Sequence, residues 1–589
     1  MSGLRGGLFA SVSALVVACV VVIGAGAASN PHSAKSKLTK HDRALIARQA
    51  ARGAHTVSLL IATPRGRTAS VAKNIREIGG KVAYRNNKLG YIRARVPVRK
   101  ADQASRVRGI QTINVDTVLP LPDPIPDGQQ PPNPQTPPDA TTPRVNPYMP
   151  TRDTGAAQFV NAHPNFDGRG VTVGILDLGV DLDHPSLNTT STGARKITDW
   201  VTYTDPLTDG DPTWRNMQAF APVNVVGGSF TSPFPGNPVY TGVAEDGVYR
   251  IARMLESSLG ATSEFGIACG ADLNRNGICG DFFAILWRES DNTVYVDSNN
   301  DRSFLGEPQM TDYKDQYDVS RFGVDNPATE IREAVPFVVQ VDVPRKFVNI
   351  GIVSGAHGSH VAGITAGHSL FGGQMSGAAP GAKVVSVRVC LFTSGCTSHA
   401  LIEGMIYAVE TADVDVVNMS IGGLPALNDG NNTRAVLYNR LIEDNNTQMF
   451  ISAGNSGPGG NTIGDPAVAT KVMAVGAYIT KETWQKNYGS DANFQDNLHP
   501  FSSRGPAEDG AFKPEIVAPG AAISSVPTWQ VGQPVAGVYT LPPGYGMFNG
   551  TSMAAPQAAG AAALVDLQGR RVKHFCRSLF VQFSSGGSC

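Results

Sequence analysis

The fold is decided by the stretch Val171-Thr-Val-Gly-Ile-Leu-Asp177-Leu-Gly179. Its apolar, largely β-branched run predicts a buried strand, and the glycine two residues after the aspartate predicts a sharp exit from that strand. Asp177 then stands at the carboxyl end of a parallel strand, where the functional sites of open α/β sheets collect. The stretch therefore predicts an α/β fold around a central parallel sheet, with Asp177 at the edge where such sites lie.

Two further stretches, far along the chain from Asp177, carry residues that can take part in catalysis. They are His357-Gly-Ser-His360-Val-Ala-Gly363 and Gly550-Thr-Ser552-Met-Ala-Ala-Pro556. Each continues into small and apolar residues, which are typical of a tightly packed helix. We therefore expect His357 and Ser552 to stand at helix N-termini, where the aligned backbone dipoles stabilise developing negative charge.

A serine hydroxyl is a poor nucleophile at neutral pH. It becomes reactive when a neutral imidazole accepts its proton and a buried carboxylate orients that imidazole. Asp177, His357 and Ser552 supply these groups in the chain order Asp…His…Ser, which differs from the orders in chymotrypsin and in the α/β-hydrolases. We predict that these three residues are catalytic.

Together the three stretches resemble the subtilisin-like serine proteases. The resemblance implies a three-layer subtilisin-like α/β fold that hydrolyses protein or peptide substrates through an acyl-enzyme at Ser552, with no cofactor for catalysis. One departure is Leu178, because subtilisins usually carry Ser or Thr after the catalytic aspartate. A milder one is Gly-Ser-His after His357, where Gly-Thr-His is commoner.

Two further segments carry the same resemblance. Phe450-Ile-Ser-Ala-Gly-Asn455-Ser-Gly-Pro458 places Asn455 at the family's oxyanion position, where its amide and the backbone N–H of Ser552 would bind the tetrahedral intermediate's oxygen. Asp415-Val-Val-Asn-Met-Ser420-Ile-Gly422-Gly423 resembles the substrate strand. Ser420, Ile421 and Gly422 would line one wall of the specificity pocket and pair with the substrate as an added β-strand.

Composition narrows the classes of function. The 589 residues suffice for two or more domains, and 41% hydrophobic with 17% charged residues suits a globular protein. Lys+Arg and Asp+Glu are balanced at 49 each, so composition gives no support for a nucleic-acid or polyanion partner.

The N-terminus, residues 1–28, predicts a signal peptide and therefore a secreted, extracellular protein. Arg5 supplies the positive charge, Leu8 to Ile23 form the apolar core, and Ala25-Gly-Ala27 is a small-residue cleavage pattern. No stable membrane span is expected after cleavage, although an uncleaved anchor is the alternative.

Residues 29–118 predict a folded propeptide. Alternation and periodicity give the order strand, helix, strand, strand, helix, strand, at residues 57–61, 69–78, 81–84, 91–96, 101–107 and 112–115. This order resembles the small α+β, ferredoxin-like propeptides of subtilisins, which implies a folding assistant that is also an intramolecular inhibitor. Residues 119–150 are so rich in proline that we expect an extended linker, cut during processing.

The catalytic domain is expected at 151–568, with an insert at about 200–345 between Asp177 and His357. An insert of this size also resembles the pyrolysin and tripeptidyl-peptidase branches of the family. Two loops in it place oxygen side chains at alternate positions, as loops that wrap Ca²⁺ do, and predict a structural calcium site. The candidate ligands are Asp272, Asn274, Asn276 and Asp281 in the first loop, and Asp297, Asn299 and Asp301 in the second. Neither loop has the full EF-hand pattern, and two acidic β-turns are the alternative.

Four cysteines form two pairs that are close in sequence, Cys269 with Cys279 and Cys390 with Cys396. In an oxidising compartment these predict local disulfides, with free buried thiols as the alternative. The tail at 569–589 matches no segment expected of the family, and it is typical of a truncated or frameshifted product.

Three functions remain open at this stage. The leading one is a secreted endopeptidase, with a tripeptidyl-peptidase-type exopeptidase as its variant. The second is a truncated, inactive homologue. The third is a calcium-dependent binding protein built around the insert.

Overall fold

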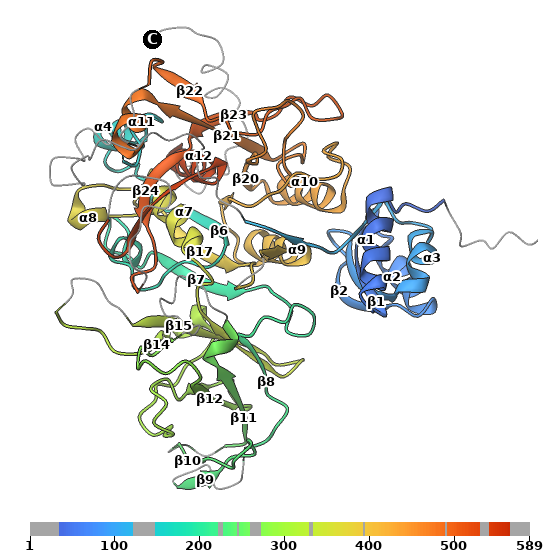
Figure 1. The fold of residues 1–589 in the computed structure, drawn as a ribbon, viewed down its shortest axis with the longest axis vertical. Helices are drawn as coiled ribbons and strands as arrows, with labels where there is room; N and C mark the ends of the chain where they lie inside the picture. Colours follow the sequence, from blue (N-terminus) through green and yellow to red (C-terminus); the bar gives the residue numbers. More distant parts are fainter. Residues whose placement is uncertain are drawn as a thin grey trace, which may run out of the picture.

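The computed structural model describes residues 35–121, 148–221, 228–243, 245, 247–259, 272–328, 334–392, 395–488, 492–529 and 541–565. The predicted signal peptide, most of the proline-rich linker and the tail at 569–589 lie outside these residues. Figure 1 shows three parts: a layered central body, a smaller N-terminal domain beside it, and the insert below.

The central body is built on a sheet whose strand order is β22-β21-β20-β19-β6-β17-β7, with β23 paired to β21. Every pair is parallel except β21 with β22, so the predicted parallel sheet is mixed at one edge. Its strands are β6 (Thr172–Asp177), β7 (Ile197–Thr202), β17 (Lys383–Arg388), β19 (Val416–Met419), β20 (Gln448–Ser452), β21 (Met473–Thr480), β22 (Asp496–Leu498) and β23 (Ile516–Pro519).

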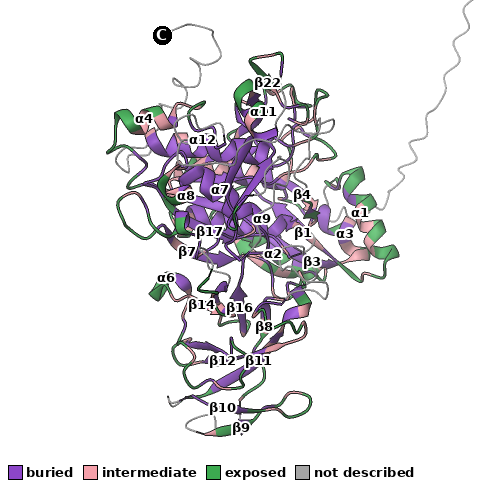
Figure 2. Ribbon diagram, turned by 60° about the vertical axis from the view of Figure 1, so that its left-hand side comes forward, coloured by how far each residue is buried: buried purple, intermediate pink, exposed green. Residues whose placement is uncertain are grey.

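The strands alternate between two apolar layers, as a sheet covered by helices on both faces requires. Val173 and Ile175 of β6 point into a core that contains α7 (His357–Ala366) and α12 (Thr551–Val565). Leu176 points into the opposite core, with α9 (Ser398–Ile406) and α10 (Thr433–Asn445). Figure 2 shows α7, α9 and α12 buried at the centre of the molecule. The two apolar cores on opposite faces of the sheet confirm the three-layer prediction.

Shorter elements complete this body. They are α4 (Ala156–Ala162), α5 (Pro185–Asn188), α8 (Leu370–Gly373), β18 (Cys396–Thr397), the π-helical turn η5 (Tyr407–Thr411), α11 (Lys481–Tyr488), and the hairpin of β24 (Ala521–Ser525) with β25 (Tyr545–Asn549). No helix in the described part of the chain is long and apolar enough to cross a membrane.

The insert folds as two small antiparallel sheets of its own between β7 and α7. One sheet has the order β11-β12-β13, the other β14-β15-β16-β8, and a separate β9–β10 hairpin lies at the tip. The elements are β8 (Trp214–Asn216), β9 (Ser229–Thr231), β10 (Val239–Thr241), β11 (Tyr249–Leu255), η4 (Glu256–Leu259), β12 (Phe282–Arg288), β13 (Val294–Val296), α6 (Tyr313–Gln316), β14 (Ser320–Phe322), β15 (Val335–Asp342) and β16 (Phe347–Gly351).

The N-terminal domain confirms the predicted element order. Its antiparallel sheet runs β2-β3-β1-β4. The elements are α1 (Lys40–Ala51), β1 (Thr56–Ala62), α2 (Thr68–Glu77), β2 (Lys81–Asn86), β3 (Tyr91–Pro97), η1 (Val98–Lys100), α3 (Ala101–Ser105) and β4 (Thr112–Val115). After β4 the chain forms β5 (Val118–Leu119), which pairs antiparallel with β18 of the central body.

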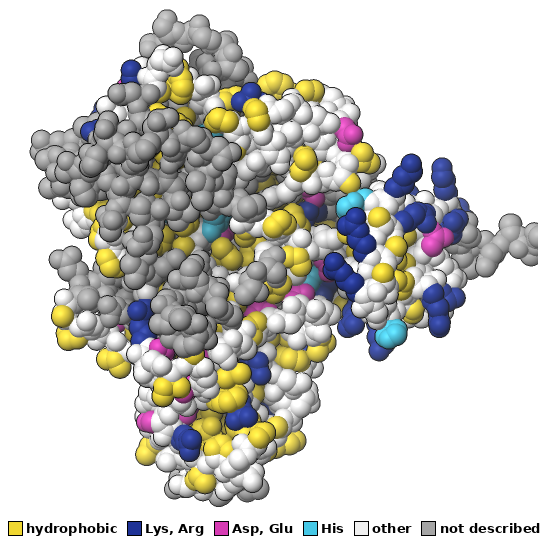
Figure 3. All heavy atoms as spheres, in the orientation of Figure 1, with side chains coloured by type: hydrophobic (Ala, Val, Ile, Leu, Met, Phe, Trp, Pro, Cys, Tyr) yellow, Lys and Arg dark blue, Asp and Glu magenta, His cyan; other side chains and the backbone are white. Residues whose placement is uncertain are grey.

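Opposite charges join the N-terminal domain to the central body. Lys and Arg side chains gather on this domain in Figure 3, and the partners across the contact are acidic. The central member is Arg93 of β3, 4% exposed, which donates to Glu403 at 2.8 Å and to Asp205 at 2.8 Å. At the end of β4, Asp116 accepts a 2.7 Å hydrogen bond from His399. Burial lowers the pKa of His399, but Asp116 and Asp209 outweigh it and raise that pKa to about 10.

We predict that Arg93→Ala destabilises the full-length chain far more than removal of an exposed arginine does. The substitution leaves Glu403 without its cation in a buried site, and breaking such a pair costs roughly 3–5 kcal/mol. Chemical denaturation of the Ser552→Ala background measures this cost. The control is Arg43→Ala, whose ion pair with Asp102 is 47% exposed on the arginine side and is expected to contribute below about 1 kcal/mol. Equal costs for the two variants would contradict the prediction.

Candidate active site

The structure brings Asp177 and His357 together. Asp177 ends β6 and is fully buried, while His357 begins α7, as the sequence predicts for both. The Nδ1 atom of His357 lies 2.8 Å from Oδ1 and 2.9 Å from Oδ2 of the carboxylate. A carboxylate in this position fixes the ring and favours the tautomer that carries its proton on Nδ1.

Asp177 accepts a local hydrogen bond even though Leu178 has no side-chain hydroxyl. The backbone N–H of Leu178 donates to Oδ1 of Asp177 at 2.8 Å, a hydrogen bond that does not depend on the side chain at this position. The carbonyl of Leu178 in turn accepts from the backbone N–H of Ser354, at 2.8 Å, just before α7. The strand end that holds the carboxylate and the helix that holds the imidazole are thus tied by backbone bonds.

Ser552 is the second residue of α12 and only 5% exposed. Its hydroxyl donates to the backbone carbonyl of Ser420 at 3.2 Å, and its own carbonyl accepts from the Ser420 hydroxyl at 2.7 Å. This two-way contact joins the predicted nucleophile to the predicted substrate strand. The hydroxyl must turn from Ser420 before it can donate to an imidazole, and such hydrogen bonds often form only when substrate is bound.

Asn455 follows β20 and faces the start of α12. Its Oδ1 accepts from the backbone N–H of Thr551 at 3.0 Å and from the Thr551 hydroxyl at 2.9 Å. Because the oxygen end of the amide is held on this side, the NH₂ end points away from Thr551 and is free to serve as a donor. The Thr551 hydroxyl also accepts from the backbone N–H of Gly454 at 3.2 Å. Sequence reasoning did not single out Thr551, although its position directly before the nucleophile was the available signal.

The predicted substrate strand is a short extended segment after β19. The side chains of Ser420 and Ile421 are buried at 1% and 0%, so they contribute packing, and only Gly422 of the three is partly exposed. Gly423 exchanges two backbone hydrogen bonds with Asp465, at 3.2 and 2.9 Å. The segment is therefore fixed on one side by the protein's own chain.

His360, one turn after His357, has a structural role. It is fully buried, stacks on Phe548 at 4.4 Å between ring centroids, and its Nε2 lies near the carbonyls of Ala522 and Gly546 at 3.2 and 3.1 Å. Burial lowers its pKa to about 3, which keeps the ring neutral. His360 thus anchors α7 to the β24–β25 hairpin.

The far end of α7 is held by Lys196. Its ammonium donates to the carbonyls of Ala366, Pro380 and Ala382 at 2.5, 2.6 and 3.1 Å. Burial lowers the pKa of Lys196 to about 7. Three accepting carbonyls favour the charged form nonetheless, because a neutral amine has only two hydrogens to donate. A cation at this position also complements the negative end of the helix dipole.

The two predicted calcium loops form Asx-type turns. Asp272 accepts from the backbone N–H groups of Asn276 and Gly277, and Asp297 from those of Asp301 and Arg302. The side chains of Asn274 and Asn276 donate to Asp281, and that of Asn299 donates to Asp301. Across the described ranges no three His, Cys, Asp or Glu side chains converge closely enough to hold a metal. The calcium site stays a prediction.

One predicted disulfide is confirmed. Cys390 and Cys396 are bonded and close the loop between β17 and β18. Cys279 is also disulfide-bonded, while its predicted partner Cys269 lies outside the described residues.

Comparison with known proteins decides the family. The Subtilase family matches residues 168–569, a range that contains Asp177, His357, Asn455 and Ser552. The chain belongs to the subtilase family of serine peptidases. The "Putative peptidase inhibitor domain" matches residues 28–116, which include the whole N-terminal domain.

Several curated relatives are similar over a large part of this subtilase. Pyrolysin of Pyrococcus furiosus is 28% identical over 87% of the chain, and tripeptidyl-peptidase 2 of Caenorhabditis elegans is 28% identical over 70%. The chain spans only 39% and 32% of these two proteins. Serine protease AprX of Bacillus subtilis is 32% identical over 36% of the chain and 48% of its own length.

Among solved structures, that of tripeptidyl peptidase 2 superposes with a TM-score of 0.50. It is 21% identical and covers 72% of the chain and 34% of that protein. At this level of identity the likeness concerns the fold.

We predict that Thr551→Val slows peptide hydrolysis by up to about tenfold, because the Asn455 amide loses a neutral hydrogen bond of about 1 kcal/mol that orients it. Asn455→Ala, which removes the donor itself, is expected to slow hydrolysis by about 10²–10³-fold. Thr551→Ser retains the hydroxyl and is the control. Steady-state kinetics on one peptide substrate give the three kcat values. A Val variant as fast as the Ser variant would show that Thr551 does not position the amide.

Proposed function

We propose that this chain is a secreted serine endopeptidase in which Asp177, His357 and Ser552 form the catalytic triad. The observation that carries the proposal is the buried contact between His357 Nδ1 and Asp177 at 2.8 Å. That contact leaves Nε2 as the basic nitrogen of the ring, because the proton is held on Nδ1 by the carboxylate. Ser552 is the second residue of α12, and α12 packs against α7, the helix that His357 begins.

The reaction follows from these groups. Nε2 of His357 takes the hydroxyl proton of Ser552 as Oγ attacks the peptide carbonyl, and the carbonyl π electrons move to the oxygen. The backbone N–H of Ser552 and the amide of Asn455 stabilise that oxyanion. The imidazolium then protonates the leaving amine, the C–N bond breaks, and water repeats the sequence to release the acid.

The contact between β5 and β18 supports internal cleavage. Here an extended segment of the chain, Val118–Leu119, pairs as an added strand with Cys396–Thr397, and the backbone N–H of Ser398 donates to Thr117 at 2.8 Å. A whole folded domain precedes this segment, so nothing at this edge requires a free amino terminus. This is the β-strand-addition mode of peptide recognition. The same contact supports the proposal that the N-terminal domain acts as an intramolecular inhibitor.

Secretion is part of the proposal. It is supported by the signal-like sequence at residues 1–28 and by the disulfide between Cys390 and Cys396, because disulfides persist mainly in oxidising compartments.

Self-processing tests the triad. The full chain and its Ser552→Ala variant are expressed in a secreting host, and the intact masses of the products are measured. We expect only the parent to lose the region that precedes about Thr151, because cleavage of the linker requires the serine. Absence of processing in both proteins would favour the inactive homologue, and processing in both would assign the cut to another protease.

A tripeptidyl-peptidase activity is the second candidate, and the similarity to tripeptidyl-peptidase 2 favours it. A peptide of about ten residues distinguishes the endopeptidase from the tripeptidyl-peptidase activity. It is assayed in a free form and in a blocked form, which is acetylated at the amino end and amidated at the carboxyl end. An endopeptidase cuts the blocked peptide internally at a rate within about threefold of the free peptide. Stepwise release of tripeptides from the free form alone would replace the endopeptidase proposal.

We also propose that the two loops of the insert bind structural Ca²⁺. Asp272 and Asp297 support this, because both residues are buried, at 6% and 0%, and Asp297 lies near the acidic side chains of Asp301 and Glu307. A chelator is expected to lower the melting temperature of the Ser552→Ala protein by several degrees. Asp297→Asn, which alters one of the two loops, should make that difference smaller. The control is Asp509→Asn, which alters an exposed turn aspartate elsewhere. A melting temperature that chelator leaves unchanged would exclude calcium.

A further inference from the structure

A pocket of about 480 Å³ lies where the insert folds over the central body, apart from the triad. Its floor comes from the loop after β6, from α5 and from the start of β7, and its other wall from α6 and β14 of the insert. The lining residues are Leu182, Asp183, Pro185, Leu187, Asn188, Arg195, Ile197, Tyr313, Tyr317, Val319 and Arg321. The volume lies within the range of roughly 300–1,000 Å³ that is usual for small-ligand sites.

The two arginines that line this pocket differ in whether a carboxylate neutralises them. Arg321 makes two hydrogen bonds to the Asp183 carboxylate, at 2.5 and 2.6 Å, and is neutralised by it. Arg195 is exposed and has no carboxylate partner within the described ranges; its guanidinium stacks on the Tyr317 ring, 4.5 Å from the centroid. Among the side chains that line the pocket there are two cations and one carboxylate, and the cation that this carboxylate does not neutralise is Arg195.

Tyr317, whose ring lies beneath Arg195, has an unusual backbone conformation. Its φ is positive, at 62°, in the left-handed region that bulky residues rarely adopt. It packs edge-on against Tyr313 at 5.5 Å, and the Tyr313 hydroxyl donates to the carbonyl of Ile197 at 3.1 Å. Strained residues of this kind persist where the surroundings determine them, and they gather at ligand sites.

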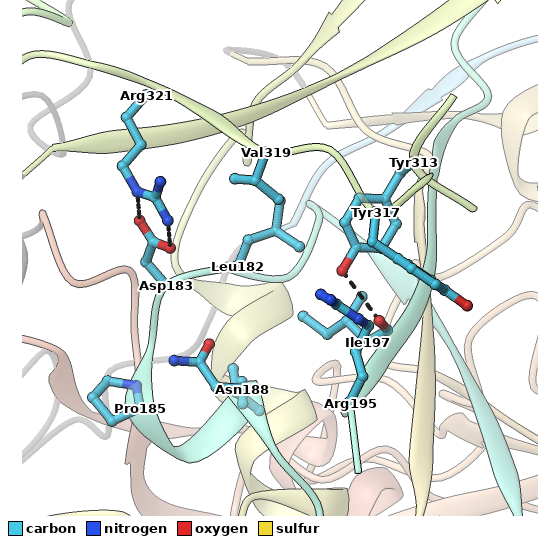
Figure 4. Close-up of a pocket in the computed structure, with 11 residues that line it drawn as sticks. Leu182, Asp183, Pro185, Asn188, Arg195, Ile197, Tyr313, Tyr317, Val319 and Arg321 are labelled. Carbon is cyan, nitrogen blue, oxygen red and sulfur yellow. Dashed lines mark hydrogen bonds and ion pairs between the residues drawn. The ribbon is translucent and has the colours of Figure 1, made fainter. Parts of the chain in front are cut away.

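Figure 4 shows how these groups face the pocket. The Asp183–Arg321 pair closes the left side, Leu182 and Val319 lie in the middle, and Arg195 with the two tyrosines forms the right side. Asn188 lies below, between the two sides, and its amide offers both a donor and an acceptor. A ligand there meets an apolar wall, a flat aromatic and cationic surface, and an amide.

We propose that this pocket binds the carboxyl terminus of a peptide whose last side chain is apolar. The carboxylate pairs with Arg195, whose planar fork matches its two oxygens. The apolar side chain lies against Leu182 and Val319, and the last peptide group meets Asn188. A phosphate group would call for more than one unpaired cation, and a long acyl chain for a closed apolar channel, and the pocket provides neither.

This inference goes beyond the proposed catalysis and does not depend on it. The insert would thereby add to the subtilase body a second place that recognises peptides, namely their free carboxyl ends. Such ends are formed by any peptide-bond hydrolysis, including that proposed at Ser552.

The test uses the full chain with Ser552→Ala, so that the probe is not hydrolysed. Isothermal titration calorimetry measures the binding of acetyl-Ala-Ala-Phe with a free carboxylate and of the same peptide with a carboxamide. We expect the carboxamide to bind about tenfold more weakly or worse, because a hydrogen bond to a charged group is lost. Arg195→Gln is expected to weaken the carboxylate peptide by the same factor, and Tyr317→Leu to weaken it as well.

Arg302→Gln, which removes an exposed arginine that does not line the pocket, is the control and should bind as the parent does. Binding at the triad cleft would be insensitive to both Arg195→Gln and Tyr317→Leu, and this result overturns the proposal. The proposal is also overturned if the carboxylate and carboxamide peptides bind equally, or if no binding is seen at about 1 mM peptide. Competition by inorganic phosphate as strong as that by the carboxylate peptide overturns it as well. If Arg195→Gln does not fold, Tyr317→Leu alone decides.

Discussion

The close approach of α7 to the exit of β6 is the constraint on which the site depends. A Cβ atom at Gly358 would lie 2.1 Å from the carbonyl oxygen of Gly179, so only glycine lets the first helical turn touch the loop after Asp177. Gly179 itself has a φ of 94° and lies against Trp200. Because the two backbones meet here, the side chain of His357, one residue earlier, reaches the carboxylate of Asp177.

The same close packing extends to the helix that carries the serine. A Cβ at Gly560 of α12 would lie 2.6 Å from the Cβ of Ala378 and 2.8 Å from the Thr365 carbonyl of α7. The small residues that follow Ser552 and His357 are thus explained by contact between the two helices, since any larger side chain would force them apart. Lys196 and His360 fix α7 from its other sides, so its first residue has little freedom to move.

Buried ion pairs join the N-terminal domain to the subtilase body. Charges such as Arg93 with Glu403 and His399 with Asp116 are buried in the contact, where each carries a large desolvation cost that only its partner offsets. An interface of this type is specific, because a wrong partner leaves a charge unpaired. The insert meets the same body through aromatic and aliphatic groups and through the ion pair of Arg321 with Asp183. Among the residues that line the pocket between them, Arg195 is the cation that no carboxylate neutralises.

The sequence by itself determined the fold class and the order of elements in the N-terminal domain. It also determined that Asp177 stands at the end of a strand and that His357 and Ser552 stand near the starts of helices. These follow from local rules: alternation of apolar residues, glycine at sharp exits, and runs of small residues in packed helices. The sequence did not determine the orientation of Asn455 by Thr551, the buried partners of Arg93, or the pocket under the insert. These join residues that lie far apart in the chain, and only the tertiary structure decides which of them meet. Arg195 and Tyr317, 122 positions apart, carry no local signal of contact, because their stacking exists only after the insert has folded onto the sheet.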